Sequence, residues 1–353
     1  MEKNWLMAVV MAGFAGMAQA SSSVTLYGAL DTAVGYERTK QHATGVTQKR
    51  TGFFNGIETG NHWGLKGTED LGQGLRATFQ LESGFDLTDG QSSQGGRLFG
   101  RHATVGLTGE SWGEIRVGLQ KSVSSLFFVE LDDQGWEGTG SSAVFTGMDS
   151  YRVDNAVMYF SPEYDGFQFG AGYSFNVDGA QAPKINGQPD SNQRFFTTGL
   201  SYNKGPLSAA LTYDQVRLPN VNTVNNYKNA QGWSISGSYD FAVVSVAVAF
   251  GQDFNSKLGR DEFYRKDFRY DNYSVALAVP LGHGRLTGNY AISAPRKAAK
   301  DSGEKNMQSY SLAYSYPFSK RTSLYALGAY TQNYMQINKD TNTIGVVGIR
   351  HNF

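Results

Sequence analysis

Leu75-Arg76-Ala77-Thr78-Phe79-Gln80-Leu81-Glu82 alternates strictly between apolar and polar side chains. Because successive side chains of a β-strand point to opposite faces, this segment forms a strand with one apolar and one polar face. The polar face carries both a base and an acid. Such a face suits the wall of a water-filled interior, with lipid against the apolar face.

The same alternation recurs along the whole chain and indicates many membrane-crossing strands. About 16 such segments can be counted, each about 9–13 residues long, which is the length that a tilted strand needs to cross a bilayer. They predict an all-β fold: a transmembrane, antiparallel, 16-stranded up-and-down β-barrel. The segments are 24–36, 61–69, 74–86, 99–109, 112–120, 152–161, 166–175, 194–203, 206–217, 231–240, 242–252, 270–279, 284–293, 307–317, 321–334 and 340–353.

The connections between these segments alternate in length, which favours a membrane barrel over a soluble sandwich. Short turns on one side and long polar loops on the other are typical of outer-membrane barrels. A soluble, lectin-like sandwich has no reason to keep this asymmetry. The short turns are expected at 108–111, 161–166, 203–206 and 280–283, and the long loops near 37–60, 86–98, 121–151, 176–193, 218–230, 253–269 and 294–306.

Composition narrows the classes of function. The 31 basic and 31 acidic residues balance, so bulk charge gives no reason to expect a nucleic-acid partner. Without cysteine, the chain has no disulfide framework and no thiolate chemistry. The 43 glycines and 42 tyrosines and phenylalanines favour aromatic strands joined by glycine turns. Mean hydropathy is −0.39, as expected when apolar residues occupy only alternate positions.

The first twenty residues resemble an export signal. Lys3 precedes an apolar stretch from Leu6 to Ala18, and Ala18-Gln19-Ala20 matches the pattern before a signal-peptidase site. A buried N-terminal helix is the alternative. We expect residues 1–20 to be a signal peptide cleaved near Ala20, and residues 21–353 to form the barrel in the bacterial outer membrane.

A barrel of this size encloses an aqueous channel that side chains cannot fill, so something must narrow it. The segment of about 121–151 is the longest connection, and a long loop inside a compact fold is usually functional. We expect it to be the third loop, folded into the lumen with its carboxylates facing the pore. The alternative is an external loop. The acidic candidates are Glu130, Asp132, Asp133 and Glu137.

Basic side chains opposite these acids would create a transverse field that orders water and polar solutes. The alternative for each of them is a solvated strand charge with no role in the pore. The candidates on polar strand faces are His62, Lys66, Arg76, Arg101, Arg116 and Arg152.

Four stretches resemble the general porins of Gram-negative β-proteobacteria: 23–31 (SVTLYGALD), 64–72 (GLKGTEDLG), 152–166 beginning RVDNAVMY, and 348–353 (GIRHNF). The resemblance implies a 16-stranded barrel, a homotrimer and passive diffusion of ions and small hydrophilic solutes. It also implies an arginine cluster facing the third loop, to which Arg101 and Arg152 correspond.

Two positions depart from that cluster. His62 and Leu119 stand where the family commonly has arginine, which lowers the positive charge of the expected constriction. With an ordinary histidine pKa of about 6.5, His62 is largely neutral at pH 7. We therefore expect modest selectivity, with a preference for anions that grows in acid.

The expected partners are outer-membrane lipid and lipopolysaccharide, and the barrel-assembly machinery, for which the terminal Phe353 resembles a recognition signal. No cofactor, metal or catalytic group is expected, since the five histidines lie in no known catalytic or metal-binding pattern. The predicted function is an outer-membrane diffusion pore. The alternatives are a substrate-specific channel with a saturable solute site and an outer-membrane enzyme.

Overall fold

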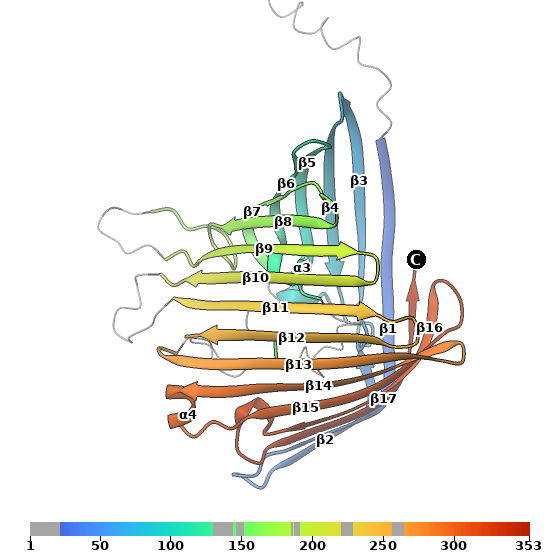
Figure 1. Ribbon diagram of the computed structural model, residues 1–353, viewed down its shortest axis with the longest axis vertical. Helices are drawn as coiled ribbons and strands as arrows, with labels where there is room; N and C mark the ends of the chain where they lie inside the picture. The colour runs from blue at the N-terminus through green and yellow to red at the C-terminus, as the bar shows by residue number, and fades with distance from the viewer. Residues whose placement is uncertain are drawn as a thin grey trace, which may run out of the picture.

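The computed structural model describes residues 22–129, 144–145, 152–184, 186, 191–219, 229–255 and 265–353, so the expected signal peptide lies outside the described residues. Antiparallel strands follow one another around one continuous sheet (Figure 1). Among the described residues, no helix is both long and apolar enough to cross a membrane. The helical elements in these ranges are short: α2 (Ser93–Gly96), α3 (Val123–Phe127), α4 (Ala298–Asp301) and the 3-10 helix η3 (Tyr334–Gln336).

The sheet contains the following strands: β1 (Ser22–Lys40), β2 (Thr47–Asn55), β3 (His62–Gly72), β4 (Leu75–Gly84), β5 (His102–Gly109), β6 (Gly113–Lys121), β7 (Arg152–Phe160), β8 (Phe167–Ser174), β9 (Arg194–Lys204), β10 (Leu207–Arg217), β11 (Ala230–Asp240), β12 (Ser245–Phe254), β13 (Phe268–Leu281), β14 (Gly284–Lys297), β15 (Met307–Pro317), β16 (Thr322–Gln332) and β17 (Thr341–Asn352).

The long strand β1 closes the sheet into a barrel. On one side it pairs with β17, from Ala29 opposite Asn352 to Lys40 opposite Thr341. On its other side it pairs with β3 along its first half and with β2 along its second half. Since β2 and β3 share one position in the wall, the 17 strands form a closed barrel of 16, as predicted. Phe353 completes the seam through two backbone hydrogen bonds with Gly28, of 3.0 and 3.1 Å.

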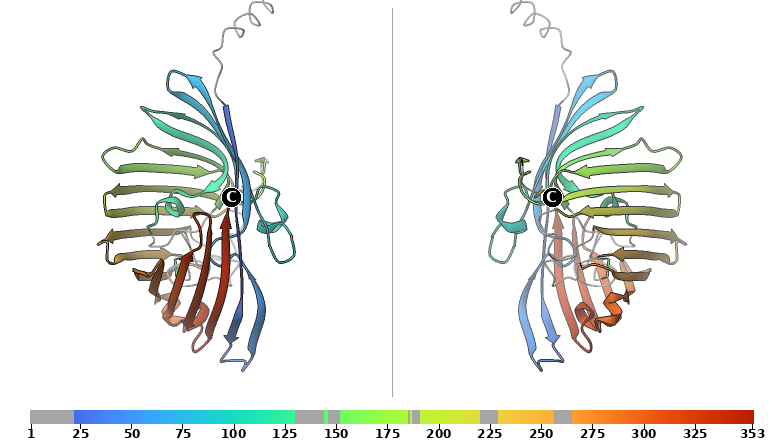
Figure 2. Two further views of the ribbon diagram at one scale, coloured as in Figure 1. Left: turned by 90° about the vertical axis from the view of Figure 1, so that its right-hand side faces the viewer. Right: turned by 90° about the vertical axis from the view of Figure 1, so that its left-hand side faces the viewer.

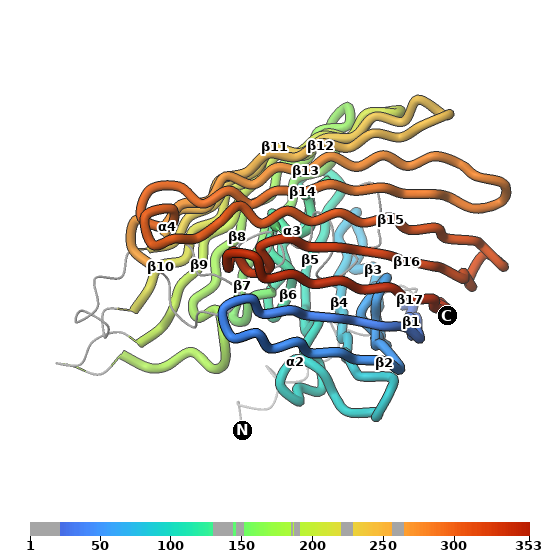
Figure 3. Tube along the Cα trace, turned by 90° about the horizontal axis from the view of Figure 1, so that it is seen from below, coloured from blue at the N-terminus to red at the C-terminus, as the bar shows by residue number. Residues whose placement is uncertain are grey.

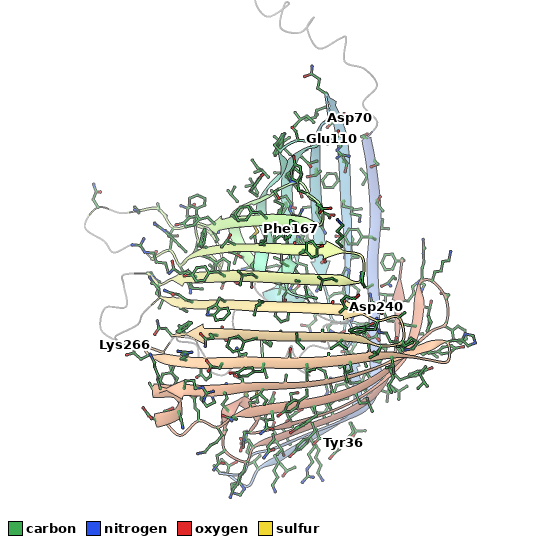
Figure 4. All side chains as sticks on the ribbon, viewed as in Figure 1. Tyr36, Asp70, Glu110, Phe167, Asp240 and Lys266 are labelled. Atoms are coloured by element: carbon green, nitrogen blue, oxygen red, sulfur yellow. The ribbon has the colours of Figure 1, made fainter. Side chains whose placement is uncertain are left out.

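The two walls of the barrel cross at a steep angle. Strands β8–β14 of the front wall run across β3–β6 of the rear wall (Figure 1), which is the strand tilt that closure requires. The short turns meet at one rim and the longer connections at the other. Asp70, Glu110 and Asp240 mark the rim of short turns, and Lys266 marks the opposite rim (Figure 4). Tight turns need left-handed backbone there, which Gly205 and Gly282 provide with φ of 61° and 62°.

The predicted alternation is confirmed on the outer face. Val105, Leu211 and Val248 point outward and expose 61%, 53% and 54% of their surface. Inward neighbours such as Thr104 and Thr212 are buried. Aromatic side chains pack against one another on the outer face near both rims: Phe167 with Tyr202 and Tyr239 with Phe241 on the short-turn side, Trp233 with Phe250 and Tyr290 with Tyr310 on the other. These rows resemble the interfacial girdles of membrane barrels.

The prediction of a long loop over 37–60 was wrong. There β1 continues to Lys40 and β2 pairs with it from Thr47 to Asn55, forming a hairpin that extends the wall. The segment TQKRTGFFN has a polar half, because a strand above the apolar belt is not required to alternate. Residues 41–46 form the turn of this hairpin, and residues 56–61, here called the β2–β3 break, form an irregular connection to β3.

Candidate pore constriction

The β2–β3 break is held on the lumen side of the wall by Asp31. This residue faces inward from β1 and is fully buried. Its Oδ2 accepts hydrogen bonds from the backbone N–H groups of Glu58 and Thr59, at 2.6 and 2.7 Å, and its Oδ1 accepts one from the Tyr325 hydroxyl at 2.6 Å. A buried carboxylate with this many donors holds its neighbours rigidly. His62, which directly follows the break, is therefore held at a fixed position on the wall.

An ion pair lies on the same wall, on β4 and just before β5. The Nε of Arg101 lies 2.6 Å from Oε1 of Glu82, and the two side chains are 13% and 8% exposed. Oε2 of Glu82 accepts a hydrogen bond of 2.8 Å from the Tyr27 hydroxyl, which itself accepts one of 2.6 Å from the Gln80 amide. The guanidinium is thus fixed in position, while Glu82 offsets part of its charge.

His62 completes this group. Its Nδ1 lies 2.7 Å from the carbonyl oxygen of Gly60, and its ring lies edge-on to Tyr27 with centroids 6.3 Å apart. It interacts electrostatically with Arg101, Glu82 and Arg152. The structure therefore brings three of the six predicted basic residues together, and we call His62, Arg101 and Arg152 the basic wall group.

Lys66 and Arg116 face the lumen at the margin of this group. The Nζ of Lys66 lies 5.1 Å from the centroid of the Tyr27 ring. Arg116 stacks on Phe160, 4.4 Å from its centroid, and its Nε is 3.5 Å from Oε1 of Glu114. Arg116 pairs opposite Gly106 of β5. Gly106 is four positions, or about 13 Å, along the strand from His102, which directly follows Arg101.

Arg76 is not part of the group. It pairs opposite Asp70 beside the β3–β4 turn, six positions along β4 from Glu82, or about 20 Å away. Arg76 and Arg101 both face inward, but they lie at different depths. Alternation in sequence assigns a side chain to a face and says nothing about its depth in the pore.

The predicted acids Glu130, Asp132, Asp133 and Glu137 lie outside the described residues. The segment leading to them is described and packs on lumen-facing side chains of the other wall. Ser122 caps α3 by accepting a hydrogen bond from the Ser125 N–H at 3.1 Å. Figures 1 and 2 show α3 on the inner side of β9 and β10.

Polar contacts tie α3 to this wall. The Ser124 hydroxyl donates to Oδ2 of the buried Asp214 on β10. The backbone N–H of Val123 donates to the Thr197 hydroxyl at 3.1 Å, and that of Val129 donates to the Ser236 hydroxyl at 2.9 Å. These strands each supply an inward polar atom at the depth of α3, so its position is fixed by the wall.

A second piece of the β6–β7 connection packs further round the lumen. Val144 and Phe145 are buried in one apolar cluster with Ala249 of β12, Ala291 of β14 and Met307 of β15. Phe145 also lies 5.0 Å from Phe128, between ring centroids. Among the described residues of this connection, the aromatic side chains of Phe127, Phe128 and Phe145 pack toward the inner wall.

The sequence analysis missed Glu82 and Tyr27 as members of the site. Both stand on the polar face of their strands, and Glu82 ends the segment quoted first. The signal was therefore present, but β-strand pairing was needed to place Tyr27 of β1, Glu82 of β4 and Arg101 side by side.

Comparisons with known proteins agree with this architecture. A family model described as Gram-negative porin matches residues 7–334. An outer membrane porin protein of Bordetella pertussis is 40% identical, with full coverage of both chains. Outer membrane porin protein 32 of Delftia acidovorans is 31% identical over 98% of this chain and 92% of its own length.

A solved structure, the anion-selective porin from Comamonas acidovorans, superposes with a TM-score of 0.74 and 27% identity, covering 94% of this chain and all of that one. The closed 16-stranded barrel, the two-faced strands and the matches along almost the whole chain agree with one another. The chain therefore belongs to the Gram-negative porin family, and it is an outer-membrane porin.

Proposed function

We propose that residues of about 121–151 form a constriction loop that narrows the lumen opposite the basic wall group. Ions and small hydrophilic solutes then diffuse passively through the remaining opening. The observation that supports this most directly is the anchoring of α3 to Asp214 on one inner wall, with the Arg101–Glu82 pair on the other. Carboxylates of the loop, Glu130, Asp132, Asp133 and Glu137, would face His62, Arg101 and Arg152.

The pore should prefer anions only modestly. The related porin from Comamonas acidovorans is described as anion-selective. In this chain, however, histidine stands at position 62, and Glu82 lies 2.6 Å from Arg101. Each reduces the positive field across the opening, because the field depends on the summed charge of the wall.

Reversal potentials in a salt gradient across a planar bilayer test this proposal. Arg101→Gln should shift the potential toward cation preference, since it removes a fixed positive charge from the narrowest part. Arg321→Gln, in the exposed turn before β16, removes the same charge from the rim and should change the potential much less. Equal shifts in both variants would contradict the proposed constriction.

The size dependence of transport separates the diffusion pore from a saturable channel. Liposome swelling should slow smoothly with sugar size and remain linear in sugar concentration. A rate that saturates with one sugar would favour the substrate-specific alternative. We propose no catalytic step for this chain, in keeping with a family of channels.

We also propose that the mature barrel begins near Ser21 and assembles as a homotrimer. The family resemblance supports both. In addition, the segment around α2 stands off the wall of β1 and β3 on the side away from β11 and β12 (Figures 2 and 3), where it could reach another subunit. N-terminal sequencing tests the first point. Three equal conductance steps per insertion test the second.

A further inference from the structure

Two arginines lie on the outer face of the barrel at the rim of long connections. Arg269 of β13 and Arg296 of β14 are directly opposite each other. Their strands pair without a register shift, so Arg269 shares a face with Tyr273 and Leu277, which expose 41% and 50% of their surface. Because that face meets lipid lower down, the arginines point away from the pore.

Asp271 fixes both guanidinium groups. Its Oδ1 lies 3.2 Å from Nε of Arg269 and its Oδ2 lies 2.9 Å from Nε of Arg296. The Gln252 amide also donates to Oδ1, at 3.1 Å, and Arg269 lies 5.1 Å from the centroid of the Phe254 ring. Asp271 is 7% exposed, whereas the arginine side chains are 28% and 47% exposed. The acid is therefore covered, whereas both guanidinium groups remain partly exposed on the outer face, and Arg296 also interacts with Tyr273.

The surrounding charge is positive although the whole chain is balanced. Segments 265–271 and 296–305 together hold seven basic and four acidic residues, against 31 of each in the chain. One carboxylate between two guanidinium groups leaves an uncompensated positive charge at the pair itself. An anion that approaches from outside meets donors already held in place, which lowers the entropy cost of binding.

The depth of this pair matches lipid headgroups. Trp233, Phe250 and Tyr273 form an outward aromatic row with neighbouring centroids 5.3 and 4.9 Å apart, and such rows lie at the membrane interface. Arg269 lies four positions beyond Tyr273, about 13 Å along the strand. At the long-loop rim, which is the extracellular side of an outer-membrane barrel, this level holds the headgroups of the outer leaflet.

We propose that Arg269 and Arg296 form a binding site for the phosphate group of a phosphorylated glycolipid headgroup in the outer leaflet. A phosphate accepts charge-assisted hydrogen bonds from guanidinium groups, and each arginine has further N–H groups besides the Nε that contacts Asp271. The acyl chains of the same lipid would lie along the apolar face below, beside Tyr273 and Leu277. The site lies outside the lumen, so its occupancy is independent of the proposed constriction.

Native mass spectrometry of the detergent-purified protein with diphosphoryl lipid A as the probe tests this site. The wild-type barrel should retain the diphosphorylated lipid and bind the dephosphorylated form at least about tenfold more weakly, which corresponds to about 1.4 kcal/mol. The R269Q/R296Q double variant should lose most of this discrimination. Its single-channel conductance should stay at the wild-type value, because neither side chain faces the pore.

The matched control removes two positive charges from the opposite rim. The K320Q/R321Q variant, in the exposed turn between β15 and β16, should bind diphosphoryl lipid A like wild type. Retained heat-modifiable mobility on gels shows that each variant is folded. Equal discrimination in R269Q/R296Q would overturn the proposal. So would full competition by millimolar inorganic phosphate, which would identify a site for free anions.

Discussion

Glu82 is the side chain whose removal should most increase the anion preference of the pore. Its carboxylate lies 2.6 Å from Arg101 and is little exposed. Glu82→Gln keeps the shape of the side chain but removes its negative charge, so the basic wall group gains about one net positive charge. The reversal potential in a salt gradient should move toward the anion limit.

A second carboxylate provides the control for this change. Glu110→Gln, at the tip of the β5–β6 turn (Figure 4), removes the same charge from the rim and should leave the reversal potential nearly unchanged. In Glu82→Gln the amide oxygen can still accept a hydrogen bond from Arg101, and the new NH2 group, at the position of Oε2, can donate to the Tyr27 hydroxyl, so the variant should fold. A shift toward cations in Glu82→Gln would show that Arg101 does not act on the permeating ions.

His62 should make the selectivity depend on pH. An imidazole gains a proton as the pH falls, so its charge adds to that of Arg101 and Arg152 in acid. The change in reversal potential between pH 8 and pH 5 should be smaller in His62→Ala than in wild type. His42→Ala, in the β1–β2 hairpin, should behave like wild type. Equal pH shifts in wild type and His62→Ala would place His62 outside the constriction.

At the scale of single elements, α3 shows how a short helix is positioned by a sheet. Five residues cannot form a stable helix alone. Ser124→Ala removes the hydrogen bond to the buried Asp214, and such a loss costs about 1–3 kcal/mol. We expect more frequent brief closures and greater open-channel noise in single-channel recordings.

The control for this prediction lies in the same helix. Ser125 contributes its backbone N–H to the Ser122 cap, so Ser125→Ala leaves that bond in place. Its recordings should match those of wild type. Wild-type noise in Ser124→Ala would mean that the remaining contacts of Val123 and Val129 are enough to hold the segment.

For the whole molecule, the seam between β1 and β17 is where closure is completed. Deleting Phe353 removes two backbone hydrogen bonds with Gly28, each worth about 0.5–1.5 kcal/mol. The refolded barrel should unfold at a lower temperature in heat-modifiability gels. Phe353→Leu keeps both backbone bonds and should fall between the deletion and wild type.

The same two variants separate stability from assembly in cells. We propose from the family resemblance that the assembly machinery recognises the aromatic ring of Phe353. Phe353→Leu should then reduce the amount of barrel in the outer membrane by more than its lower melting temperature explains. A wild-type amount of Phe353→Leu barrel in the outer membrane would contradict the proposed recognition of Phe353 by the assembly machinery.

The strands and their faces followed from the sequence with few errors, and the site followed only in part. Strand β2 was missed because it rises above the apolar belt, where no alternation is imposed. Arg101 and His62 were found as inward bases, whereas Arg76 shares their face and lies about 20 Å away. The outward pair Arg269 and Arg296 went unnoticed, since two arginines 27 positions apart share no local pattern.

The amino-acid order alone was sufficient for the compartment, the barrel and the number of strands crossing the bilayer. The reason is that lipid outside and water inside impose a two-residue alternation on each strand. Such an alternation is visible within each short stretch of sequence, without knowledge of the rest of the chain. Partners and depth depended on the three-dimensional pairing. Asp31 meets Tyr325 across 294 positions and Glu82 meets Arg101 across 19. Those contacts arise from strand register and barrel closure, which are properties of the whole sheet.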